Sequence, residues 1–173
     1  MLRNRWVVIG TALGVWLAVT SFTSVPQSIA LAQGKGVITQ KAISLDLAQE
    51  IAQAALAKCR EDNYHVSVHV IDASGLDKIA LRDDGSGEVN FRVSREKAFT
   101  ALTYRRPSAD MEKAWVNMSP ARIIPGIFGV AGGLPIKVGD EVIGAVGVGG
   151  APGGEKDQAC AAAGLAKVAD ELK

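Results

Sequence analysis

Residues 129–150, GVAGGLPIKVGDEVIGAVGVGG, predict the centre of a β-sheet. Two apolar runs with β-branched residues, 134–138 and 141–148, are typical of strands. Gly139 and Asp140 lie between them, and a glycine in first position suits a two-residue hairpin loop, which requires a positive φ there. The predicted hairpin is the element against which the rest of the chain is interpreted.

Small side chains gather on one predicted face of the second strand of this hairpin. That face consists of Ile143, Ala145, Gly147 and Gly149. Glycine within a strand costs backbone entropy and often marks a close approach by another backbone. Residues 155–172 are rich in alanine and predict a narrow helix. We therefore expect the C-terminal helix to lie on this face.

The remaining segments predict an α+β fold. Hydrophobic periodicity and capping residues predict helices over 44–61, 94–106 (capped by Ser94) and 108–115, and strands over 65–71, 77–82 and 127–131. The order is then helix, two strands, two helices, three strands, helix, which indicates an antiparallel five-stranded sheet with flanking helices. Glycines at turns or close approaches are expected at Gly75, Gly132, Gly133, Gly139 and Gly147.

The first 32 residues have the pattern of a signal peptide. Arg3 and Arg5 precede an apolar run over 6–22, and Ala30-Leu31-Ala32 has the small-x-small pattern of a cleavage site. We expect a mobile leader over 33–43, a single domain over 44–173, and a periplasmic or secreted protein without membrane association after cleavage. An uncleaved anchor is the alternative, because the run reaches the lower limit of about 17 residues for a membrane-spanning helix.

Charge and cysteine content narrow the functional classes. The chain has 19 Lys and Arg against 18 Asp and Glu and no basic run, so nucleic-acid binding is not expected. Export would permit a disulfide between the two cysteines, Cys59 and Cys160, whereas the other interpretation is two separate small residues buried in helices. Neither lies in a CxxC motif, which argues against redox catalysis and zinc binding.

Five motifs follow one another along the chain. They are VHVIDASG at 68–75, RDDG at 82–85, SREKAFTA at 94–101, GGLPI at 132–136 and GDEVIGAVG at 139–147. Together they resemble the HbpS/GlcG-like family of haem-degrading or haem-binding uptake proteins, which is also related to the C-terminal domain of PduO-type proteins. The resemblance covers residues 44–172 and implies a profilin-like fold, homo-oligomers and, for several members, haem binding.

A haem site would require an axial ligand and cations for the propionates. His69 is the preferred ligand because it lies mid-strand in a family-like motif, whereas His65 stands at the start of the strand; a surface histidine is the alternative for both. The other candidates for binding the cofactor are Arg95, Lys97, Tyr104, Arg105, Met111 and Met118. For the cations the alternative is a solvated helix face, and for the methionines it is core packing.

Three functions remain open at this point. The first is an exported haem-binding protein for uptake, storage or sensing. The second is an enzyme that acts on haem or on a small oxygenated metabolite, with Lys97 as a buried general base or Schiff-base lysine. The third is an accessory subunit without a cofactor. No catalytic residue is assigned from the sequence.

Overall fold

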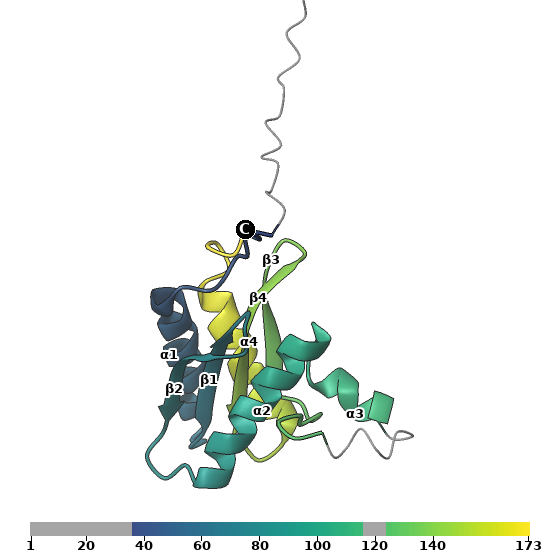
Figure 1. Ribbon diagram of the computed structural model, residues 1–173. Coiled ribbons are helices and arrows are strands. Elements are labelled where there is room, and N and C mark those ends of the chain that lie inside the picture. Colours follow the sequence, from purple (N-terminus) through teal and green to yellow (C-terminus); the bar gives the residue numbers. More distant parts are fainter. Residues whose placement is uncertain (1–35, 116–123) are drawn as a thin grey trace, which may run out of the picture. The chain divides into compact units, whose positions relative to one another are not determined.

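The elements in the described parts of the chain are four helices and four strands (Figure 1). The structure is a computed structural model that describes residues 36–115 and 124–173, so the predicted signal peptide and Met118 lie outside it. The elements, in chain order, are α1 (Leu45–Glu61), β1 (Ser67–Asp72), β2 (Asp77–Arg82), α2 (Glu88–Tyr104), α3 (Ala109–Trp115), β3 (Gly133–Val138), β4 (Glu141–Gly149) and α4 (Gly154–Lys167).

The strands form one antiparallel sheet in the order β2-β1-β4-β3. The predicted hairpin is confirmed: Val138 pairs with Glu141, and Gly139 adopts a φ of +58° in the loop between them. Gly75, in the turn between β1 and β2, also has a positive φ of +79°. The antiparallel α+β class predicted from the sequence is therefore correct.

The strand predicted over 127–131 does not form, so the sheet within the described residues has four strands instead of five. Hydrogen bonds to two side chains hold the backbone of residues 127–131 in place of a β-ladder. The N–H of Phe128 donates to Thr100 Oγ1 of α2, and the carbonyl of Val130 accepts from Ser108 Oγ. These bonds satisfy backbone groups that a sheet would otherwise pair. The profilin-like assignment stays a prediction.

One residue of β4 interrupts the regular alternation of its side chains. Ile136 pairs with Gly144, whereas the next residue, Lys137, pairs with Val142. Ile143 therefore has no partner in β3, and this β-bulge shifts the face to which it belongs. Ile143 packs in the larger core cluster with Val146, so the prediction that it shares a face with Ala145 is wrong.

The glycine face of β4 receives α2 and not the C-terminal helix. A Cβ atom built on Gly147 would overlap the backbone of Ser94 and lie 2.6 Å from the amide nitrogen of Ala98. The predicted close backbone approach thus exists, but the predicted partner is wrong. The small residues of α4 pack against α1 instead, since a Cβ atom on Gly164 would lie 2.6 Å from the carbonyl oxygen of Ile51 in α1.

Helices α1 and α4 cover the face of the sheet opposite α2 (Figure 1). The larger core lies on this side, and α1 begins as predicted, with Ser44 Oγ accepting from the N–H of Leu47. Ile43, the last residue of the predicted mobile leader, is already buried in this core. A disulfide joins Cys59 of α1 to Cys160 of α4, with 5.5 Å between their Cα atoms. This resolves the two interpretations of the cysteines in favour of a bridge.

Helix α2 begins two turns earlier than predicted. Its N-cap is Gly87, whereas Ser94, the predicted cap, is buried within the helix. Glu88 in the first turn has a charge that suits the positive end of the helix dipole. Ser94 Oγ donates to the carbonyl of Phe91, a local bond that serine commonly makes inside helices. This longer helix covers the strand face that carries His69.

None of the helices within 36–115 and 124–173 has the length and hydropathy of a membrane span.

Candidate functional site

His69 lies on the face of β1 that α2 covers, and its side chain is 2 % exposed. Its Nδ1 atom is 2.8 Å from Ser94 Oγ, and its ring meets the Phe91 ring edge-on, with 4.4 Å between centroids. The interpretation of His69 as a surface histidine is therefore wrong. Ser67, two residues earlier on the same face of β1, is fully buried as well.

The hydrogen bonds of Ser94 favour one tautomer of His69. A serine hydroxyl has one proton, and Ser94 Oγ lies 2.8 Å from the carbonyl of Phe91, to which it can donate that proton. In this arrangement Ser94 Oγ accepts the bond from His69, so Nδ1 carries the proton and Nε2 keeps its lone pair. Among the described residues Nε2 has no hydrogen-bond partner.

Burial lowers the pKa of the His69 imidazole to about 4. Arg95 acts in the same direction, whereas the carboxylate of Asp77 opposes it. The ring is therefore neutral at physiological pH. A neutral imidazole held by its Nδ1–H is the form in which histidine binds a metal through Nε2.

The surface has a pocket of about 230 Å³ that is lined by Arg82, Glu88 and Phe91. Arg82 lies opposite Ser67 in the register of β1 and β2, which places it on the same face of the sheet as His69. Phe91 connects the two features, because it lines the pocket and contacts the His69 ring. The pocket therefore combines an aromatic wall, a guanidinium group and a carboxylate.

Ion pairs hold the two ends of β2. Arg95 Nε donates to Asp77 Oδ2 at 3.0 Å and thereby ties α2 to the start of β2. Asp83, which follows β2, is 3 % exposed, and the hydrogen bond from Arg60 is the main reason that its pKa lies below the ordinary value. Its Oδ2 atom has no hydrogen-bond partner but lies 3.5 Å from Nδ1 of the exposed His65.

Lys97 is buried away from the pocket in an ion pair with Asp157. Its Nζ donates to Asp157 Oδ2 at 2.6 Å, and the two side chains are 3 % and 4 % exposed. Asp157 also accepts from the N–H of Ala151, while burial, the dominant influence, raises the pKa of its carboxyl. Because Asp157 opens α4, the pair joins the helices on the two faces of the sheet. The amine of Lys97 is therefore not exposed to a substrate.

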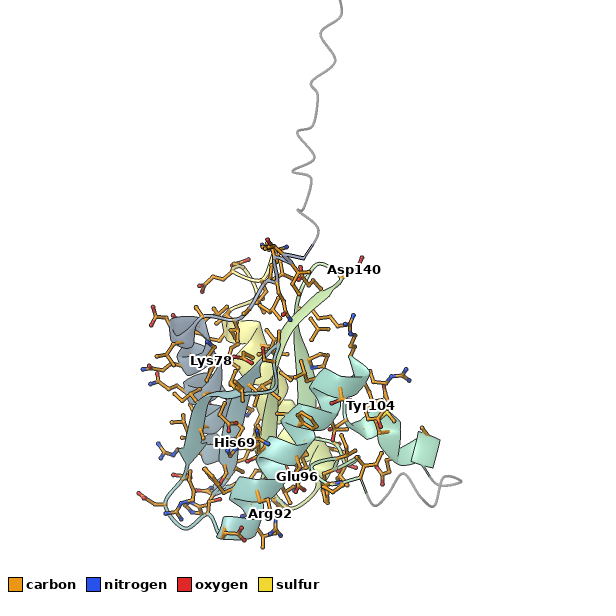
Figure 2. The ribbon with its side chains drawn as sticks, viewed as in Figure 1. His69, Lys78, Arg92, Glu96, Tyr104 and Asp140 are labelled. Carbon is orange, nitrogen blue, oxygen red and sulfur yellow. A yellow bond between two sulfur atoms is a disulfide. The ribbon has the colours of Figure 1, made fainter. Side chains whose placement is uncertain are left out.

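The other predicted site residues do not converge on His69. Figure 2 shows His69 beneath the N-terminal half of α2 and Tyr104 at its C-terminal end. Ser94 and Tyr104 are ten residues apart, which corresponds to about 15 Å along a helix. Arg105 is exposed at the C-cap with a φ of +56°, and Met111 is buried at 6 % exposure. Of the predicted cations, Arg95 has a charge that lowers the pKa of His69.

Four residues of this region were missed by the sequence analysis. Ser94 was expected only as a helix cap, Arg82 stood in the RDDG motif without an assigned role, and Phe91 and Asp157 were not assigned to the site. Motif 94–101 does contain both Ser94 and Lys97, but periodicity alone does not show that one binds His69 and the other Asp157. Within the described ranges, no three His, Cys, Asp or Glu side chains lie close enough to hold a metal ion. Ligation of a metal by this face would depend on His69 and on a group that supplies its own remaining ligands, as haem does.

Comparison with known proteins agrees with the fold. Residues 43–166 match the family described as haem degrading protein HbpS-like. The chain is 33% identical over 111 residues to protein GlcG of Escherichia coli strain K12, covering 64% of this chain and 83% of that protein. It is 34% identical over 118 residues to an uncharacterized 15.0 kDa protein of Citrobacter freundii, covering 62% of this chain and 80% of that one.

Solved structures share the same architecture. HbpS superimposes with a TM-score of 0.74 at 33% identity, covering 78% of this chain and 96% of HbpS. A complex of PduOC with haem superimposes with a TM-score of 0.68 at 19% identity, covering 73% and 94% of the two chains, and this likeness concerns the fold alone. With the match over residues 43–166 and the five motifs in order, the chain belongs to the HbpS-like family.

Proposed function

We propose that this protein is an exported haem-binding protein, acting in the uptake, storage or sensing of haem. The observation that carries the proposal is the state of His69: a neutral imidazole whose Nδ1–H is held by Ser94 and whose Nε2 lone pair is free of hydrogen bonds from the described residues. Haem supplies a redox-active iron with four ligands of its own, and the protein would supply an axial nitrogen. The family description and the haem complex of a protein with the same fold support this proposal.

The dimensions of the site favour binding at a surface over complete enclosure. A pocket of about 230 Å³ lies below the volume of about 300–1,000 Å³ that usual ligand pockets have. A porphyrin would therefore place one edge in the pocket and leave the rest outside. We propose that a second copy of the chain covers the exposed part, which agrees with the homo-oligomers that the family resemblance implies.

Export is proposed on two grounds. The segment over 1–32 has the composition of a signal peptide, and the disulfide between Cys59 and Cys160 is typical of proteins in oxidising compartments. Intact-mass measurement of the exported protein tests the first ground. Cleavage after Ala32 is the expected result, and retention of Met1 would favour the membrane-anchor alternative.

Titration of the purified protein with hemin tests haem binding. We expect a Soret band that saturates at one haem per site and that shifts or disappears when His69→Ala is introduced. His65→Ala is the matched control, because that side chain is 63% exposed and lies 3.5 Å from Asp83. Near-ultraviolet circular dichroism of both variants checks that each is folded.

The titration also separates the alternatives. If hemin shows no saturable binding to the wild-type protein, the proposed function is wrong and the accessory-subunit hypothesis gains support. If bound haem is lost with reductant and oxygen while a product forms, the enzyme hypothesis is correct. An unchanged spectrum and affinity in His69→Ala would mean that another residue ligates the iron.

A further inference from the structure

We propose that the pocket between β2 and α2 recognises a planar apolar group that carries a carboxylate, with Arg82 as the anchor and Phe91 as the stacking wall. Two sources would offer this chemistry: the propionate-bearing edge of a porphyrin, or a small free aromatic acid. In the porphyrin case the assignment deepens the proposed function and rests on it. In the second case it is independent of haem.

Arg82 has the charge and the donors that a carboxylate needs. Its Nη1 atom donates to the carbonyl of Ser86 at 2.8 Å, and among the described residues it forms no ion pair with a carboxylate. Ser86 is in turn held by a buried hydroxyl–hydroxyl bond of 2.9 Å to Ser67. One nitrogen of the guanidinium is thus held in place, which leaves further donors of its planar fork for a ligand.

Phe91 supplies an aromatic surface that is already oriented. The residue is 36 % exposed although its ring contacts the buried His69, so one part of the ring is fixed and another faces solvent. Aromatic rings bind other planar groups in offset or edge-to-face arrangements. Because the ring lines the same pocket as Arg82, a planar acid can contact both residues at once.

The neighbouring charges affect which ligands are accepted. Glu88 lines the pocket and opposes an anion, but Arg92 lies 3.7 Å from its carboxylate in the same helix. Asp83, next to Arg82 in the chain, is occupied by Arg60 at 2.6 Å. Removal of the charge at Arg82 or at Glu88 must therefore change the affinity for an acid in opposite directions.

Fluorescence titrations of the purified protein with three probes test the assignment. The probes are 2-naphthoate, iron-free protoporphyrin IX and the dimethyl ester of that porphyrin, which lacks the carboxylates. We expect Arg82→Gln to weaken binding of the acids about five- to tenfold, as the loss of one charge-assisted contact implies, and to leave the ester unaffected. Glu88→Gln should strengthen binding of the acids, and Phe91→Leu should weaken binding of all probes that bind.

Lys78→Gln is the matched control, because it removes one positive charge from the same strand about 13 Å from Arg82. Arg82→Lys keeps the charge but loses the fork, so it should restore affinity only in part. Circular dichroism checks that each variant is folded.

The outcomes distinguish the two ligand sources. Arg82-dependent binding of naphthoate supports a small aromatic acid, and Arg82-dependent binding of protoporphyrin IX alone supports a porphyrin edge. If neither acid binds, or if Arg82→Gln and Glu88→Gln leave both affinities unchanged, the assignment is overturned. Naphthoate binding without any hemin Soret band would remove the proposed haem function but retain the pocket. A Soret band that depends on His69 but not on Arg82 or Phe91 would support the proposed haem function and overturn the assignment of the pocket.

Discussion

The backbone of Ser94 lies directly over Gly147, so that a Cβ atom on this glycine would overlap the Ser94 carbonyl oxygen. Gly147 is also the β4 partner of His69, and Nδ1 of His69 is hydrogen-bonded to the Ser94 hydroxyl at 2.8 Å. Because Gly147 has no side chain, α2 packs close enough to the sheet to bury His69 and to orient its ring through Ser94. Packing of α2 and the state of His69 are consequences of the same contact.

Replacing Gly147 by valine should destabilise the fold strongly. The added side chain would be forced into the backbone of α2, and overpacking costs about 1–3 kcal/mol or more when the neighbour cannot move. Urea denaturation provides the measurement, with Gly87→Ser as the control, because a Cβ atom there meets nothing within 4 Å and serine is favourable at the N-cap of a helix. Equal midpoints for Gly147→Val and the wild type would contradict the close approach.

Lys97→Met should leave Asp157 as an unpaired buried carboxylate. Breaking a buried pair from one side costs about 3–5 kcal/mol, because the remaining charge has no compensation. The double variant Lys97→Met/Asp157→Leu removes both charges and should regain most of the stability. Denaturation of the single and double variants gives the coupling energy, and additive effects would rule out the pairing.

Loss of the bridge between Cys59 and Cys160 should lower the stability of the protein by about 2–5 kcal/mol, because the bridge closes a long segment of 101 residues in the unfolded chain. Thermal unfolding with and without reductant measures the effect. The variant Cys59→Ser/Cys160→Ser should be insensitive to reductant. A wild-type midpoint that does not respond to full reduction would contradict the prediction.

Stability should fall as the pH is lowered from 6.5 to about 4, because His69 binds its proton less readily in the folded state than in the unfolded state. The unfolded chain therefore takes up more protons in this window, and the free energy of unfolding decreases by about 3 kcal/mol at most. Asp83, whose pKa is lowered by Arg60, contributes a further loss only below its ordinary value.

Urea midpoints at pH 7, 5 and 4 check this dependence. His69→Gln should flatten the profile between pH 6.5 and 4, whereas His65→Gln should retain the wild-type slope. A slope that persists unchanged in His69→Gln would assign the effect to other groups.

Local patterns predicted much of the fold. Gly139-Asp140 identified the hairpin because a two-residue loop constrains φ by itself, and Ser44 identified the start of α1 because a cap acts on the next few residues. The strand predicted over 127–131 failed for a different reason. Its apolar residues suit a ladder, but Thr100 and Ser108, distant in the chain, bind its backbone groups instead.

The candidate site was only partly predictable for the same physical reason. His69 and Lys97 were selected from the chain, since their chemistry is a property of the residue type. Whether each is buried, and against what, depends on residues 25 and 60 positions away, Ser94 and Asp157. The alternating pattern of β1 is the same whether its polar face meets water or a helix.

By itself, the sequence determined the antiparallel α+β class, the hairpin at Gly139, the need for a close backbone approach at Gly147, and the family resemblance that its motifs carry. These follow from interactions over a few residues or from the absence of a side chain. The tertiary structure alone decided that α2 and not α4 packs against Gly147 and that Cys59 pairs with Cys160. It also decided that Ser94 binds His69, and that Arg82 and Phe91 line one pocket. Such contacts join residues far apart in the chain, and only the complete packing of helices on the sheet selects them.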